Sequence, residues 1–187
     1  MIPTIQQCDQ IMDKYHMPDH IRAHSMVVAR IAHLIASGLN SAGVDISVEK
    51  TVSGAMMHDI AKISCVHSHE DHCLKGKEIC DHEGFYEISD IVNEHVILKH
   101  IVTEYDFNEK EIVNYSDKRV LHDKVVSIQE RMEDIIVRYG SHFKHIDFER
   151  LVRKNYDISQ LVEKKLFKKL DFLPQDVSEC ITDIVLL

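Results

Sequence analysis

The chain has 187 residues, of which 44% are hydrophobic and 28% charged, and its formal net charge is −9. This length fits one domain with a substantial buried core, and its apolar runs fall short of the roughly 20 residues that a membrane span needs. Phosphate backbones are bound chiefly by Lys and Arg. We therefore expect neither a nucleic-acid polymer nor a membrane among the partners.

The cysteines and the first residues of the chain indicate a reducing compartment. The five cysteines are odd in number and contain no Cys-x-x-Cys pair, which is unlike a disulfide framework. The start lacks the basic stretch and apolar block of a secretory signal, so we expect a cytoplasmic protein. Cys65 and Cys73 lie near several histidines, but ordinary reduced thiols are the favoured interpretation.

Local signals predict helices along the whole chain. Thr4 and Gln7 form a capping box at the first helix, and Ser127 and Glu130 form another later in the chain. No alternating strand pattern of convincing length occurs, so the predicted fold class is all-α. The expected helices span about residues 4–15, 20–37, 47–57, 72–80, 86–99, 108–121 and 127–139, followed by two or three between 148 and 187 with breaks near 157 and 174.

Glycine and loop signals add detail to this prediction. Gly38 is expected to end the second helix, and Gly140 a later one. Gly76, inside a predicted helix, indicates close approach of another element. The polar segment 62–71 is expected to be a loop over the functional site.

Three polar residues are predicted to point inward from helices. His24 and His95 each share a helix face with apolar residues. Taken alone, such a histidine is more often a core residue with a hydrogen-bond partner than a metal ligand. Asp117 also lies on an apolar face, and burying an unpaired carboxylate costs several kcal/mol. This aspartate is the strongest single indication of a bound cation.

The pair His58 and Asp59 ends an apolar helical run, where adjacent side chains can converge on one cation. A second such pair, His122 and Asp123, shows that the dipeptide alone is weak evidence. With His72 and the three inward residues, however, the pair forms a mixed nitrogen and oxygen ligand set. Such a set suits a divalent transition metal, one or two ions of Fe, Mn, Co, Ni or Zn.

These residues resemble the HD superfamily of metal-dependent phosphohydrolases. The order is His24, then His58-Asp59 34 positions later, then Asp117, and the run from His58 to Lys62, His-Asp-Ile-Ala-Lys, is especially similar. The resemblance covers about residues 20–140. It implies an HD-type domain at residues 1–140, and we expect residues 141–187 to be a C-terminal helical extension packed on it.

The resemblance also implies roles for particular residues. His24, His58, Asp59 and Asp117 would bind a first metal, with Asp59 able to bridge to a second metal held by His72 and His95. Asp59 and Lys62 are the expected catalytic residues, and a metal-activated hydroxide would attack phosphorus. Three basic residues are candidates for binding substrate phosphate: Lys62, and with less support Lys118 and Arg119, for which a helix-surface position is an equal alternative.

The subgroup signatures of the family leave the substrate open. The acidic pair after the dyad in guanosine tetraphosphate hydrolases is absent, as are the motifs of cyclic di-GMP phosphodiesterases. Diadenosine tetraphosphate hydrolases share the His72 and His95 pattern, but their motif after the second histidine is replaced by Val96-Ile97-Leu98. We expect a small phosphorylated substrate, such as a nucleotide. The alternatives are a non-catalytic HD signalling module and a di-iron oxygen-dependent enzyme, and the last helices could mediate homo-oligomerisation.

Overall fold

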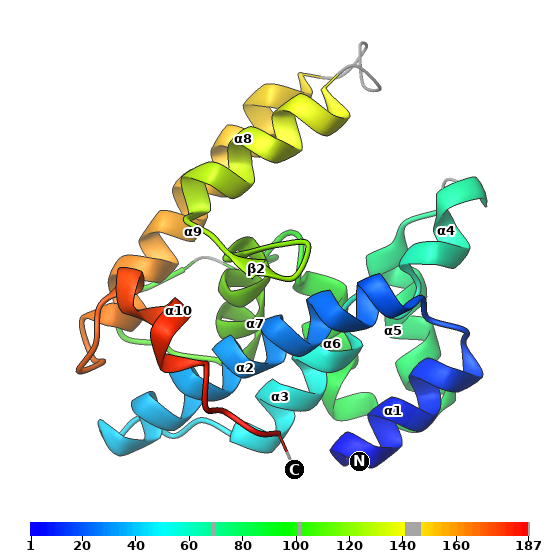
Figure 1. Ribbon diagram of the computed structural model, residues 1–187, viewed down its shortest axis with the longest axis horizontal. Helices are drawn as coiled ribbons and strands as arrows, with labels where there is room; N and C mark the ends of the chain where they lie inside the picture. Colours follow the sequence, from blue (N-terminus) through cyan, green and yellow to red (C-terminus); the bar gives the residue numbers. More distant parts are fainter. Residues whose placement is uncertain (69, 101, 141–146, 187) are drawn as a thin grey trace.

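The fold is organised around α2 (Asp19–Ser41), a 23-residue helix that runs through the middle of the bundle (Figure 1). The computed structural model describes residues 1–68, 70–100, 102–140 and 147–186. Helix α2 packs against α3 (Val48–Met57) and α7 (Glu109–Lys118), and α3 also contacts α1 (Ile5–Lys14) and α6 (Tyr86–Glu94). The remaining helices are α4 (Lys62–Ser68), α5 (His72–His82), α8 (Ile128–Tyr139), α9 (Phe148–Phe167) and α10 (Val177–Cys180), with a 3₁₀ turn at Pro174–Asp176.

The predicted all-α class is confirmed, and the local signals at the helix ends explain much of it. Both predicted capping boxes are present: Thr4 Oγ accepts from Gln7 N at 3.2 Å, and Ser127 Oγ accepts from Glu130 N at 3.2 Å. Each cap satisfies backbone N–H groups that the first helical turn leaves without partners.

Gly38 does not end α2, contrary to the sequence prediction, and lies instead at a close contact within the helix. The helix continues to Ser41, and a Cβ at Gly38 would lie 2.6 Å from Leu170 Cδ2. This glycine therefore makes room for the C-terminal segment. Gly76 is at a close helix contact, as predicted, since a Cβ there would lie 2.7 Å from Val92 Cγ1 of α6.

Three further boundaries differ from the prediction. Residues 62–68, expected to be a loop, form the short helix α4, and α6 ends at Glu94 rather than near Lys99. Helix α9 continues through Asp157 without the expected break.

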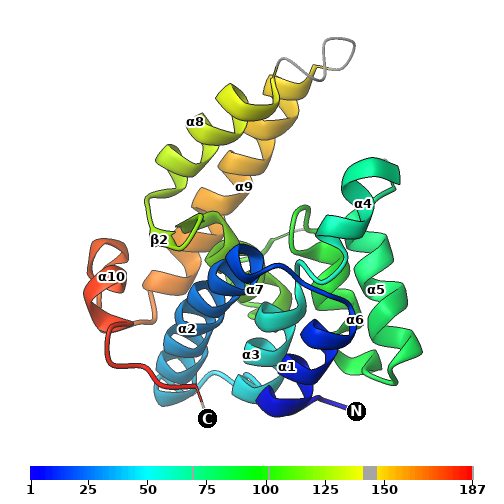
Figure 2. The ribbon, with the colours of Figure 1, turned by 45° about the vertical axis from the view of Figure 1, so that its right-hand side comes forward.

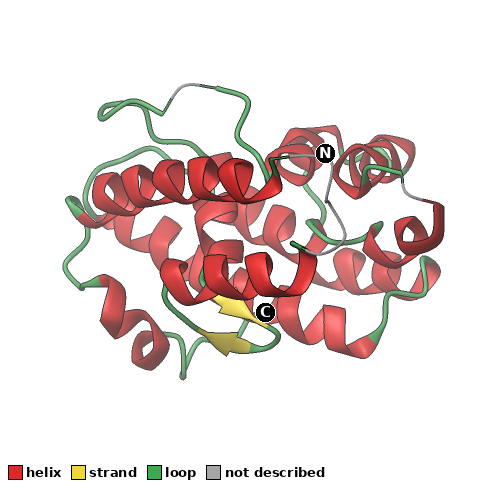
Figure 3. Cartoon of the chain, turned by 90° about the horizontal axis from the view of Figure 1, so that it is seen from above, coloured by secondary structure: helices red, strands yellow, loops and turns green. Residues whose placement is uncertain are grey.

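A short hairpin replaces the predicted end of α7. The helix stops at Lys118, and β1 (Val120–Leu121) pairs antiparallel with β2 (Lys124–Val125). His122 adopts a positive φ of 57° at the turn, a conformation that no apolar periodicity reveals. Figure 3 shows this hairpin beside the helices.

Helices α8 and α9 lie side by side and extend away from the bundle (Figures 1 and 2). The C-terminal half of α9 contacts α7, and its Val162 and Leu166 belong to the apolar core. Lys165 is buried there, against Glu111 and the carbonyl of Asp106. The domain boundary predicted at residue 140 directly follows the end of α8 at Tyr139. Residues 141–146 lie outside the described ones. The division into a domain at 1–140 and an extension at 141–187 stays a prediction.

Candidate metal centre

The six residues predicted as metal ligands lie together in the bundle core. They come from α2, the ends of α3 and α6, the start of α5, and α7. Five of the side chains are buried and one is partly exposed. Three pairs of imidazole rings, with centroids 4.9–5.3 Å apart, connect the histidines into one group. In chain order the six residues are His24, His58, Asp59, His72, His95 and Asp117.

One half of the cluster joins two histidines to two carboxylates. His24 Nε2 lies 3.1 Å from Asp117 Oδ1 and 4.0 Å from Asp59 Oδ2. His58 Nε2 lies 3.4 Å from Asp59 Oδ2 and 3.7 Å from Asp117 Oδ1. Donor atoms about 3 to 4 Å apart are the spacing of ligands that share one cation with bonds of about 2.1 Å.

The other half of the cluster uses the second oxygen of the same carboxylate. Asp59 Oδ1 lies 3.5 Å from His95 Nε2 and 3.7 Å from His72 Nε2, and these two nitrogens are 3.3 Å apart. The two oxygens of Asp59 therefore face different histidine pairs. Each oxygen of this carboxylate thus lies within reach of a different pair of imidazole nitrogens.

Backbone carbonyls fix the orientation of three of the rings. The Nδ1 atom of His24 donates to His122 O at 2.8 Å, and those of His58 and His95 donate to carbonyls one turn earlier at 2.6 Å. Because a carbonyl can only accept, each of these Nδ1 atoms carries a hydrogen, so Nε2 presents a lone pair to the cluster whenever the ring is neutral. Metal-binding histidines in proteins are commonly held in this way.

Two atoms of the cluster lack the partners that burial demands. His58 Nε2 and Asp59 Oδ1 are buried and make no hydrogen bond. Leaving a buried polar atom unsatisfied costs about 1 to 3 kcal/mol, and more for a charged group. A cation at each half of the cluster would satisfy both atoms, so the residues present fit a metal centre.

Comparison with known proteins agrees with this geometry. The HD domain matches residues 21–133, more than half of the chain. The chain belongs to the HD domain family. This superfamily consists generally of metal-dependent hydrolases. Searches of curated proteins and of solved structures gave no significant match.

The carboxylates of this HD domain are ionised at neutral pH. Burial alone would raise the pKa of Asp59, but the charges of His58 and Lys62 hold that pKa well below its usual range. For Asp117 the burial effect is likewise outweighed, by the hydrogen bond from His24 and the charge of Lys118, and its pKa is also low. The centre thus carries two negative charges in its interior.

The pKa shifts of the histidines differ between the two halves of the centre. Burial lowers the pKa of His95, and burial together with the charge of His95 lowers the pKa of His72 to about 4. Burial also opposes a charge on His58, but Asp59 and Asp117 outweigh it and raise that pKa. The half of the centre with two carboxylates therefore attracts positive charge, whether a proton or a cation.

The three basic residues predicted to bind phosphate have different surroundings. Lys62 Nζ donates to Asp59 Oδ2 at 2.6 Å, and 37% of its side chain is exposed, so it stands at the edge of the centre. Lys118 is buried and donates to the carbonyl of His95 at 2.6 Å, which fixes the end of α6. It is not a helix-surface residue.

Arg119 is buried and makes its hydrogen bonds with residues outside the cluster. Its guanidinium donates to the carbonyls of Val126 and Pro174 and to the Tyr115 hydroxyl. These contacts join α7, the hairpin and the C-terminal segment. These contacts give Arg119 a structural role, and phosphate binding by Arg119 stays a prediction.

A cavity of about 370 Å³ opens beside the first half of the centre, the half that contains His24, His58 and Asp117. Its lining includes His24, Asp59 and Lys62 together with Arg131 and Arg138 of α8. The two arginines were not singled out from the sequence. A signal was available, since both share a face of the predicted helix seven residues apart.

Asp134 holds these two arginines in place. Its Oδ2 lies 3.3 Å from Arg131 Nη1, and its Oδ1 lies 2.7 Å from Arg138 Nη2. One carboxylate between two guanidinium groups leaves this group of three α8 residues with a net positive charge. Cys73, expected from the sequence to be an ordinary reduced thiol, lies beside His72 and His95.

Proposed function

We propose that this HD domain is a phosphohydrolase that uses two metal ions to cleave a phosphate ester of a small molecule, such as a nucleotide. The observation that carries the proposal is the division of the Asp59 oxygens between two pairs of histidines. A carboxylate placed in this way suits a binuclear centre, and two-metal centres are typical of phosphoryl-transfer enzymes.

Each part of the centre then has a defined task. His24, His58, Asp59 and Asp117 would hold the first cation, and Asp59, His72 and His95 the second. When bound, the metals neutralise charge on phosphoryl oxygens and lower the pKa of coordinated water, which supplies the nucleophile.

The protein itself would bind and orient the substrate. The cavity has the size of a small-molecule site, and its Lys62, Arg131 and Arg138 side chains fit a phosphorylated ligand. Lys62 would contact the transferred phosphoryl group because it adjoins Asp59. Arg131 and Arg138, from α8, would contact the rest of the substrate. The buried carbonyls that accept from the histidines would keep each ring oriented during turnover.

The direct test is release of phosphate from a panel of nucleotides and sugar phosphates by the protein loaded with Mn²⁺, Co²⁺ or Zn²⁺. Asp59→Ala is expected to abolish turnover because it removes a ligand from both halves of the centre. If the wild-type protein binds metal but releases phosphate from none of these substrates, the result would instead favour the non-catalytic module. Activity that requires air would favour the oxygen-dependent alternative.

Arg131→Met tests the cavity. We expect KM for the phosphorylated substrate to rise about 10-fold or more, since the loss of a charged hydrogen bond costs about 1.5 to 3 kcal/mol. Arg153→Met is the matched control, because Arg153 pairs with Glu149 on the exposed face of α9. An unchanged KM in Arg131→Met would remove this arginine from the proposed substrate site.

A further inference from the structure

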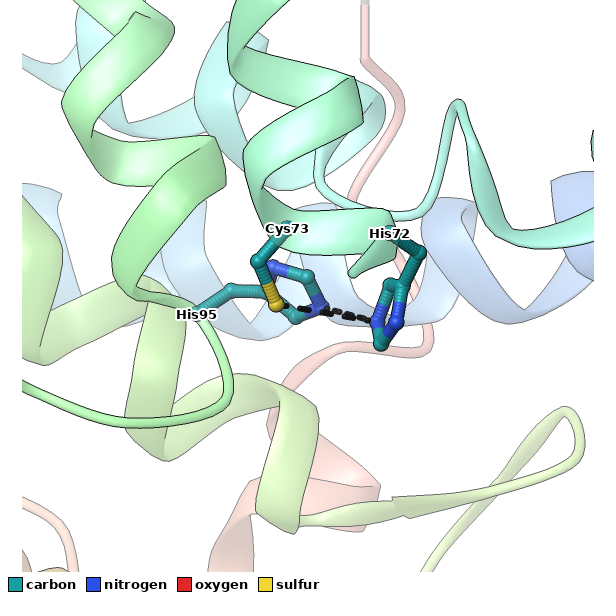
Figure 4. Close-up of side chains that lie close together, drawn as sticks. All are labelled: His72, Cys73 and His95. Carbon is teal, nitrogen blue, oxygen red and sulfur yellow. Dashed lines mark hydrogen bonds between the residues drawn. The ribbon is translucent and has the colours of Figure 1, made fainter. Parts of the chain in front are cut away.

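The thiol of Cys73 lies against the second half of the metal centre. Its Sγ is 3.8 Å from His72 Nε2, and donor atoms of Cys73, His72 and His95 all lie within 4.8 Å of one another. Figure 4 shows the three side chains directed toward one another from the start of α5 and the end of α6.

Two distances among these donors are close to those of a tetrahedral site. With metal–nitrogen bonds of about 2.1 Å and a metal–sulfur bond of about 2.3 Å, tetrahedral angles place two nitrogens about 3.4 Å apart and nitrogen and sulfur about 3.6 Å apart. The two Nε2 atoms are 3.3 Å apart, and sulfur and His72 Nε2 are 3.8 Å apart. Asp59 Oδ1, at 3.5 Å from His95 Nε2 and 3.7 Å from His72 Nε2, is close enough to both nitrogens to be the fourth ligand.

Cys73 differs from the other buried cysteines in its surroundings. Cys8, Cys65 and Cys80 belong to the apolar core, where a thiol acts as a small hydrophobic side chain. Cys73 is equally inaccessible, at 7% exposure, but is not part of that core. Its neighbours are instead the imidazoles of His72 and His95 and the carboxylate of Asp71. The buried Oδ1 of Asp59, which has no hydrogen-bond partner, faces the same two imidazoles.

The start of α5 fixes the position of the thiol. Asp71 caps the helix and accepts from Cys73 N at 2.8 Å. Gly76, one turn later, allows α5 to approach α6 closely enough for His72 to reach His95. The sulfur is thus held by the same elements that bring the two histidines together.

We propose that Cys73 is a ligand of the second metal ion, whose donor set is then two imidazoles, one carboxylate oxygen and one thiolate. This inference rests on the proposed metal centre and adds metal selectivity to it. A thiolate favours Zn²⁺, Co²⁺ or Fe²⁺ over Mn²⁺ and Mg²⁺. On binding, the thiol proton passes to solvent.

Titration of the metal-free full-length protein with Co²⁺ tests the inference by absorbance. A Cys180→Ser background removes the exposed cysteine. We expect a near-ultraviolet thiolate-to-cobalt charge-transfer band during binding of one of two equivalents. The band should be lost in Cys73→Ser and retained in Cys65→Ser, a control with the same 7% exposure.

Zn²⁺ competition gives a second measurement. Cys73→Ser should weaken one Zn²⁺ site by at least the roughly 10- to 100-fold that even an outer-shell partner contributes, with a smaller effect on Mn²⁺. Two equivalents of Co²⁺ bound by the wild type without the band would overturn thiolate ligation and leave the proposed function intact. The band without any phosphatase activity would overturn the function and support the ligand.

Discussion

Gly76 links the packing of two helices to the geometry of the second metal site. A Cβ at this position would lie 2.7 Å from Val92 Cγ1, but 3.6 Å from Ile60 Cγ2, which is ordinary contact. The steric conflict therefore involves one valine methyl group. Val92 is fully buried, so it has little room to move.

The expected energies follow from this geometry. In Gly76→Ala, overpacking costs about 1 to 3 kcal/mol, and the higher helix propensity of alanine returns about 1 kcal/mol. Val92→Ala alone removes two buried carbon atoms and should cost about 2 kcal/mol. In the double variant the new methyl group occupies the vacated space, so the two changes should offset each other by at least about 1 kcal/mol.

Urea denaturation of the two single variants and the double variant measures this coupling. Gly76→Ala should also weaken Zn²⁺ binding at the second site, and Val92→Ala should restore that binding. Combining Gly76→Ala with Val28→Ala, a fully buried valine of α2, is the control and should be additive. Additive free energies for Gly76 and Val92 would refute the close-contact reasoning.

Three further predictions concern stability. Lys165→Met removes the lysine partner of the buried Glu111 carboxylate, whose other oxygen keeps its contact with His100. The free energy of unfolding in urea should fall by about 3 kcal/mol, the lower end of the range for breaking a buried ion pair, whereas exposed Lys164→Met should have almost no effect. Lys14 lies 2.7 Å from Glu83 and lowers its pKa. The resulting stabilisation is present above the unfolded pKa of roughly 4.3 and is lost as pH falls through the folded value. Glu83→Gln should therefore destabilise by about 0.5 to 1 kcal/mol at pH 7 and progressively less as the pH falls below the unfolded value. A 100-fold excess of metal over its Kd should stabilise the fold by about 2.7 kcal/mol, a rise in Tm of roughly 5 to 11 °C for this chain length, which a chelator should reverse in calorimetry.

The sequence was most informative where the signal was local or periodic. Capping residues such as Thr4 and Ser127 act within one turn, so they locate helix starts without tertiary information. The 3.6-residue repeat likewise indicated that His24, His95 and Asp117 point inward, and the structure places all three in one cluster. Their mutual distances required the packing of α2, α6 and α7.

The features that sequence analysis missed depend on contacts between helices. Cysteine spacing rules treat Cys73 as an ordinary thiol because its neighbour His95 comes from another helix. Arg131 and Arg138 share a face of α8, but only the direction in which α8 leaves the bundle brings that face to the cavity. Arg119 was placed near the site because it lies close to Asp117 in sequence, yet α7 ends between them and the chain turns away.

The metal stoichiometry of the protein shows whether one carboxylate, Asp59, serves two cations. Elemental analysis after reloading and dialysis should give two equivalents for the wild type and one for His72→Ala. Asp59→Ala should lose tight binding at both positions, although it changes one residue only. Two retained equivalents in Asp59→Ala, or none in the wild type, would contradict a shared carboxylate at the heart of this site.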